Sequence, residues 1–217
     1  NENIGNCKFS DITVFSFHPV KIITTAEGGL ATTNDKNLNN KLSVLRTHGI
    51  TRDHNMLVNK DEGPWYYEQL YLGYNYRMTD IQAALGSSQM QKLDTFVAKR
   101  QEIAANYNNL LKSVNIKIPV QSQNNYSSYH LYVIRVTDSD SHRSVFEKLR
   151  KNGILVNLHY IPVYFHPYYQ NLGFKKGYCI EAEKYYSEAI SIPIYPDLTL
   201  EEQNFIVDIL TSEVGKA

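Results

Sequence analysis

The sequence FSFHPVKIITTAEGG, residues 15–29, joins an apolar segment to one lysine, Lys21, and then to a pair of glycines. The segment before the lysine, residues 11–17, carries apolar side chains on both faces of the strand it would form: Ile12, Val14, Phe15 and Phe17. A strand that is apolar on both faces is typical of the interior of a helix-covered sheet. We therefore expect an α/β fold in which Lys21 directly follows a buried strand.

Lys21 is the candidate reactive group of this segment. A protonated amine is no nucleophile, and it becomes one when burial or nearby positive charge lowers its pKa. Ser16 lies five residues earlier and places a hydroxyl near the strand end, where open α/β sheets bind their ligands. An amine and a hydroxyl there suit a ligand with both a carbonyl and a phosphate, such as pyridoxal phosphate. A lone lysine at a strand end is more often an ordinary surface residue, so this hypothesis depends on the rest of the chain.

The rest of the first half is predicted to contain a strand at residues 29–33, an amphipathic helix at 35–48 and a tyrosine-rich irregular stretch at 49–78. Irregular stretches of that length are usually functional or disordered, and we expect an ordered, functional one here. Thr79 and Gln82 match the capping box that opens a helix. Apolar residues keep helical spacing after it, so one long helix is expected over residues 80–113.

The remaining residues alternate between predicted strands at 129–136 and 154–158 and predicted helices at 142–152, 180–189 and 200–211. This order is typical of a small α/β domain. We expect three parts in all. Residues 1–79 would be the end of a large domain with its active-site loop, 80–113 a linking helix, and 114–217 the small domain.

Composition narrows the function classes. The chain has 217 residues, with 22 basic and 22 acidic side chains, so no charged field for nucleic acid is expected. Two distant cysteines predict neither a disulfide framework nor a metal site. No apolar run approaches the roughly 18 residues of a membrane helix, and no signal peptide is present, so a cytoplasmic location is expected. The first residue is not methionine, and we expect the chain to be part of a longer protein.

Six segments, taken in order, resemble the DegT/DnrJ/EryC1/StrS family of sugar aminotransferases, which have fold type I. They are SFHPVKIITTAEGG at 16–29, RTHGI at 46–50, GYNYRMTDIQAALG at 73–86, KRQEIAANY at 99–107, LHYIPVY at 158–164 and AISIPIYPDLT at 189–199. Together they extend over nearly the whole chain. The resemblance implies the end of the large domain of such an enzyme, followed by its small C-terminal α/β domain.

The resemblance also implies the cofactor and the residues that hold it. Lys21 would form the Schiff base with pyridoxal phosphate and then move the proton to and from the substrate carbon. Ser16 would hold the cofactor phosphate. Asn75 would reach the cofactor phosphate of the neighbouring subunit, in a homodimer with shared active sites. A plainer alternative for Asn75 is that it only shapes the backbone turn of residues 73–75.

Within the family, the sequence is most similar to members of pseudaminic acid synthesis. These aminate C4 of a UDP-linked 4-keto-6-deoxy-N-acetyl sugar, with glutamate as the amino donor. The resemblance implies a contact with the sugar nucleotide for His159 and places Arg77 near the shared cleft. His18 beside Lys21 and Tyr160 beside His159 are further candidates for substrate contacts. Packed histidines and a surface salt bridge of the arginine are the plainer alternatives. The tyrosines of residues 66–76 suit stacking on uracil or, more plainly, dimer packing.

Part of the family pattern has no counterpart in this chain. The aspartate that pairs with the pyridinium nitrogen, the aromatic residue that stacks on the ring and the amides that cradle the phosphate belong to segments that precede Asn1. Two alternatives therefore stay open. One is an inactive fragment or regulatory homologue that binds a nucleotide sugar or a partner chain. The other is an aminotransferase that acts on another nucleotide ketosugar.

Overall fold

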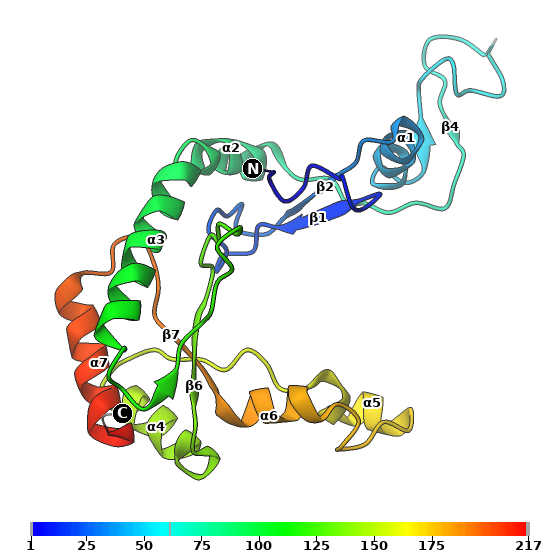
Figure 1. The fold of residues 1–217 in the computed structure, drawn as a ribbon. Helices are drawn as coiled ribbons and strands as arrows, with labels where there is room; N and C mark the ends of the chain where they lie inside the picture. The colour runs from blue at the N-terminus through cyan, green and yellow to red at the C-terminus, as the bar shows by residue number, and fades with distance from the viewer. Residues whose placement is uncertain (1, 61, 216–217) are drawn as a thin grey trace. The chain divides into compact units, whose positions relative to one another are not determined.

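The computed structural model describes residues 2–60 and 62–215, and the chain forms two compact units, Asn1–Leu93 and Asp94–Ala217 (Figure 1). Both units combine helices with short antiparallel sheets. The three-part division at residues 79 and 113 stays a prediction. Among the described residues, no helix is long and apolar enough to cross a membrane, and no cluster of three side chains suits a metal ion.

The first unit opens with a two-stranded antiparallel sheet of β1 (Thr13–Ser16) and β2 (Gly29–Thr32), in which Ser16 pairs with Gly29. Both strands were predicted, but the expected burial of β1 on both faces is wrong. Val14 is 75% exposed, because within the described residues β1 pairs with β2 and with no other named strand. A sheet of two short strands is too small to bury two faces.

Helix α1 (Lys36–Leu45) follows β2 and begins at Asp35, whose carboxylate accepts hydrogen bonds from the amides of Asn37 and Leu38 at 2.6 and 3.0 Å. The cap satisfies two of the amides that a helix start leaves without partners. The predicted helix at 35–48 is therefore confirmed, with an end three residues earlier. A short sheet of β3 (Ile50–Thr51) and β4 (Glu68–Gln69) comes next.

The long connection between β3 and β4 is folded around the carboxylate of Glu68. This carboxylate accepts hydrogen bonds from the amides of Val58 and Asn59, both at 2.7 Å, and from the Tyr66 hydroxyl at 3.1 Å. The three bonds favour the ionised form and lower the pKa of Glu68. The side chain of one buried acid, Glu68, thus holds the tyrosine-rich stretch in place. The composition of the stretch did not indicate this role.

The predicted single helix over 80–113 is wrong, because the structure has two helices there. Helix α2 (Asp80–Met90) begins with the expected capping box of Thr79 and Gln82, and α3 (Leu93–Leu110) follows after a break at Gln91 and Lys92. Neither glycine nor proline occurs at the break, and the apolar spacing continues through it, so no sequence signal marks it.

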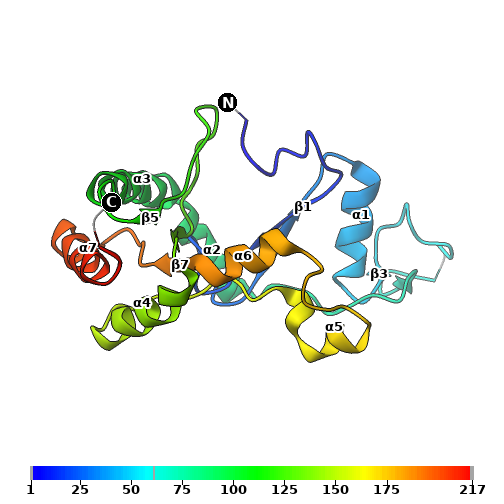
Figure 2. The same ribbon diagram turned by 60° about the horizontal axis from the view of Figure 1, so that its bottom comes forward.

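The second unit is built on a three-stranded antiparallel sheet in the order β5 (Ile116–Lys117), β6 (Tyr132–Val136), β7 (Ala189–Ile192). Helices α3, α4 (Ser139–Lys151) and α7 (Leu200–Val214) bury their apolar faces in its core. Figure 2 shows α4 and α7 beside each other, with α6 (Ile180–Glu188) leading directly into β7.

Two expectations for this unit need correction. The predicted strand at 154–158 is wrong, since only a single bridge joins Asn157 to Ser191 there. Strand β7 was not predicted, although all four of its residues are buried. The apolar pattern marked the buried residues Ile154 and Val156 correctly, but burial alone does not decide between a strand and an extended segment. The 3-10 helix η1 (Val163–Phe165) and helix α5 (Pro167–Asn171) complete the unit.

Candidate active site

Lys21 lies on a tight turn directly after β1. Its amide donates to the His18 carbonyl at 2.9 Å, and Pro19 occupies the second position of the turn. Proline favours this position, because its ring fixes the backbone angle that the turn needs. The turn is part of a larger loop, and the Lys21 side chain is half-buried in it. The sequence SFHPVK therefore fixes the backbone of the lysine close to the end of the strand.

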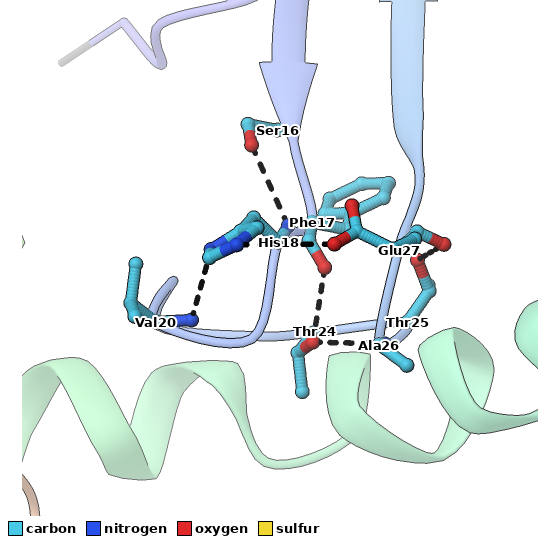
Figure 3. A network of polar contacts seen from close by, with 8 residues as sticks. All are labelled: Ser16, Phe17, His18, Val20, Thr24, Thr25, Ala26 and Glu27. Carbon is cyan, nitrogen blue, oxygen red and sulfur yellow. Dashed lines mark hydrogen bonds and ion pairs between the residues drawn. The ribbon is translucent and has the colours of Figure 1, made fainter.

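The base of this loop is closed by the carbonyl of Phe17. It accepts the amide of Thr25 at 3.0 Å and the hydroxyl of Thr24 at 2.9 Å, and the Thr24 hydroxyl accepts the amide of Ala26 at 2.9 Å (Figure 3). The Phe17 amide donates to Gly28 at 2.9 Å and continues the pairing of the two strands. These bonds give the loop a defined shape, with Lys21 midway between Phe17 and Thr25.

Polar side chains surround the turn (Figure 3). The His18 amide lies 3.5 Å from the Ser16 hydroxyl, and the Val20 amide lies 3.5 Å from His18 Nδ1. His18 Nε2 is 3.8 Å from a carboxylate oxygen of Glu27. This pair is exposed, so its contribution to stability is small. The first member of the pair, His18, is also the first residue of the turn that carries Lys21.

Asn75 and Arg77 lie on the segment that leaves the tyrosine-rich stretch. The backbone of Asn75 bridges to Thr47, and both side chains are exposed. The pairing needs two glycines: a side chain on Gly73 would overlap the backbone of Gly49, and one on Gly49 would overlap the Tyr71 carbonyl. The RTHGI and GYNYR motifs are thus two halves of one close backbone contact, which sequence analysis did not foresee.

His159 and Tyr160 belong to the second unit. Nδ1 of His159 is 2.7 Å from the hydroxyl of Ser191, and the backbones of Asn157 and Ser191 exchange two hydrogen bonds, of 2.8 and 3.1 Å. Ser191 is only 5% exposed, whereas Tyr160 is 69% exposed. Ser191 was missed by sequence analysis, although the AISIP motif contains it.

The KRQEIAANY motif lies on helix α3 and forms hydrogen bonds with the segment that follows β7. Arg100 donates to the carbonyls of Ile194 and Tyr129 at 2.9 and 3.0 Å, and the Tyr107 hydroxyl donates to Pro193 at 3.0 Å. Burial raises the pKa of the Tyr107 hydroxyl, which stays a donor at any ordinary pH. The motif therefore fixes the residues that follow β7, and its role is structural.

Known proteins share this fold. The profile of the DegT/DnrJ/EryC1/StrS aminotransferase family matches residues 2–211. The chain belongs to this family. Its fold is that of the family's pyridoxal phosphate-dependent aminotransferases, as the six sequence motifs predicted.

Individual relatives agree with the assignment. A UDP-4-amino-4,6-dideoxy-N-acetyl-beta-L-altrosamine transaminase of Helicobacter pylori is 37% identical over 216 residues, 97% of this chain and 54% of the relative. The solved structure of Helicobacter pylori PseC, an aminotransferase of pseudoaminic acid biosynthesis, is 34% identical with a TM-score of 0.85, over 95% of this chain and 54% of that one. The PMP form of Spr1654 from Streptococcus pneumoniae is 30% identical with a TM-score of 0.87, over 96% and 54%.

The chain spans about half the length of these relatives. Spr1654 has also been solved in a PLP form, which identifies the cofactor of the family fold. The residues of this chain suit that cofactor in part, since Ser16 ends β1 with a hydroxyl and the loop that follows carries the amine of Lys21. The structure brings Ser16, His18 and Lys21 together, while Asn75 and Arg77 lie on a separate segment of the first unit.

Proposed function

We propose that this chain is the C-terminal part of an aminotransferase that transfers an amino group to a nucleotide-linked ketosugar. The observation that carries the proposal is Lys21, which lies on a closed loop that begins directly after Ser16, the last residue of β1. The substrate would be a UDP-linked 4-keto-6-deoxy-N-acetyl sugar of pseudaminic acid synthesis, and glutamate would be the donor. The names of the Helicobacter pylori altrosamine transaminase and of the Helicobacter pylori PseC structure support the choice of sugar.

The chain's own residues would take distinct roles. When bound, pyridoxal phosphate supplies a carbonyl carbon that carries the amino group and a ring that accepts electrons. Lys21 would hold that carbon through its amine, and its Nζ would afterwards take up and return the proton at the sugar carbon that gains the amino group. Ser16 would donate a hydrogen bond to the phosphate, which is a strong acceptor because it is charged.

The sugar nucleotide would be bound by His18, Arg77, His159 and Tyr160. Ser191 supports this role for His159, because a hydrogen bond to one ring nitrogen orients the whole imidazole. The exposed ring of Tyr160 supports stacking on a flat group of the substrate. Asn75 would serve the cofactor phosphate of the second subunit in a homodimer.

A non-catalytic role is the second candidate. The chain covers only about half of its relatives, and a polypeptide of that kind could bind a nucleotide sugar or a partner chain without turnover. For the same reason, we infer that residues 1–217 alone bind pyridoxal phosphate weakly and catalyse no transamination. Another nucleotide ketosugar as substrate remains a variant of the first proposal.

Borohydride trapping tests the proposal directly. A protein that joins this chain to the family's N-terminal half is incubated with pyridoxal phosphate and reduced, and the modified lysine is then identified by peptide mass spectrometry. The expected result is a single adduct on Lys21, which Lys21→Ala abolishes and Lys36→Ala leaves unchanged. An adduct spread over the exposed lysines, or one that persists in Lys21→Ala, would refute the assignment of Lys21.

A further inference from the structure

The loop that carries Lys21 rests on Thr25, a residue with no assigned role. Thr25 is only 2% exposed. Its amide donates to the Phe17 carbonyl at 3.0 Å, and its hydroxyl donates to the Glu27 carbonyl at 2.8 Å (Figure 3). The first bond closes the loop, and the second fixes the side-chain rotamer, since the hydroxyl cannot turn without losing its acceptor.

The Thr25 side chain fills a space between two glycines. A Cβ on Gly28 would overlap the Thr25 hydroxyl and would come within 2.7 Å of Met78 Cε. A Cβ on Gly86, in helix α2, would lie 2.7 Å from Thr25 Cγ2. Carbon atoms pack best at about 3.5–4.0 Å. The methyl group of Thr25 therefore occupies the place that a side chain at position 86 would need.

This contact connects two distant family motifs. Thr25 and Gly28 belong to ITTAEGG, while Met78 and Gly86 belong to GYNYRMTDIQAALG. We propose that Thr25, seated between Gly28 and Gly86, is the positioning residue that fixes the Lys21 loop on helix α2. The role of Lys21 rests on the function proposed above, but the contact itself is a property of this chain alone.

A glycine-to-alanine change distinguishes this proposal from ordinary helix behaviour. Alanine is a better helix former than glycine, so Gly86→Ala should raise the melting temperature if position 86 has room. With Thr25 in the way, Gly86→Ala should instead lower it. Ser87→Ala is the matched control, because Ser87 is exposed on the same helix. It should leave the melting temperature unchanged or slightly higher.

A double variant tests whether the side chains at positions 25 and 86 compete for the same space. Thr25→Ser keeps the hydroxyl that bonds Glu27 and removes only Cγ2, so the double variant Thr25→Ser with Gly86→Ala restores the number of methyl groups. We expect the double variant to melt close to the wild type. A double variant that is less stable than both single variants would contradict the packing.

The position of Lys21 needs a readout of its own. Reductive methylation of the folded chain, followed by peptide mass spectrometry, gives the labelling rate of Lys21 relative to the exposed Lys36. Gly86→Ala should raise this ratio severalfold, and the double variant should return it to the wild-type value. If melting falls while the ratio stays constant, Thr25 supports the fold but does not position the lysine, and the proposal is wrong.

Two further results keep the test decisive. If Gly86→Ala does not fold, Thr25→Ser alone should still raise the Lys21 ratio, because it empties the contact without a clash. A constant ratio in that variant would overturn the proposal. Borohydride trapping with pyridoxal phosphate separates the two inferences: failure to trap Lys21 with an intact labelling response would count against the proposed function only.

Discussion

The Ser191 hydroxyl lies 2.7 Å from Nδ1 of His159, and it links the LHY segment to the last buried strand. The same serine exchanges two backbone hydrogen bonds with Asn157. The side-chain bond therefore orients the imidazole on a segment that is already fixed. Because the two residues come from different sequence motifs, neither motif by itself reveals the pair.

Ser191→Ala should remove this hydrogen bond of His159 and destabilise the chain by about 0.5–1.5 kcal/mol, the usual net contribution of one hydrogen bond. Urea unfolding measures the loss, and NMR of the imidazole nitrogens should show a changed tautomer population for His159. Ser187→Ala is the control, because that hydroxyl donates an exposed hydrogen bond to the Lys184 carbonyl of its own helix. Equal unfolding midpoints for the two variants, with unchanged His159 signals, would argue against the bond.

Glu68 should make the tyrosine-rich stretch sensitive to acid. Its pKa is lowered in the folded chain by bonds from the amides of Val58 and Asn59, so its stabilising effect is fully present above the ordinary glutamate pKa of about 4.3. The effect is lost as the pH falls through the lowered folded value. Trp65, the only tryptophan, lies in this stretch, and its emission should change in that window.

Two variants test whether Glu68 is the group that causes the acid-dependent change in emission. Glu68→Gln should give at pH 7 the emission that the wild type reaches only in acid, because an amide is a poorer acceptor for two backbone amides and cannot be ionised. Glu62→Gln changes an exposed acid of the same stretch and should retain the wild-type profile. A Glu68→Gln profile that still follows the wild type would assign the transition to another group.

The exposed apolar side chains of the β1–β2 sheet should cause association of the isolated chain. Val14 on one face is 75% exposed, and Leu30 on the opposite face, where it pairs with Phe15, is 51% exposed. Apolar surface on a sheet with unpaired edges is a common site of aggregation. Val14→Thr, which preserves the branched shape, should reduce light scattering. Val58→Thr is the control, because Val58 is 79% exposed outside any strand. A monodisperse monomer for the unmodified chain would contradict this expectation.

The sequence predicted those features that depend on local chemistry. The capping box of Thr79 and the helix after Asp35 both formed as expected, because each needs only neighbours a few residues away. The missed features depend on distant partners. Strand β7 needs β6 as its neighbour, and Thr25 matters because Gly86 lies against it. Apolar residues on both faces of β1 indicated a larger sheet than the two-stranded one that β1 and β2 form.

Asn75 provides the sharpest test of a shared active site. Its backbone is fixed by the bridge to Thr47, and its side chain is exposed just before the capped helix α2. A hydrogen bond from this amide to a charged phosphate contributes about 1.5–3 kcal/mol. In a dimeric protein that joins this chain to the family's N-terminal half, Asn75→Ala should therefore weaken cofactor binding about 10- to 150-fold. Lys21 would still be modified at saturating cofactor.

Mixed dimers decide whether Asn75 serves its own subunit or its partner. If the site is shared, a dimer of one Asn75→Ala chain and one Lys21→Ala chain has one site with both lesions and one site with neither. Activity should then return in part when the two inactive or weakened variants are mixed, since intact sites form only in mixed dimers. Subunit exchange must be shown separately, for example by native mass spectrometry of chains with different tags. Exchange without any recovery of activity would mean that Asn75 contacts no cofactor across the dimer.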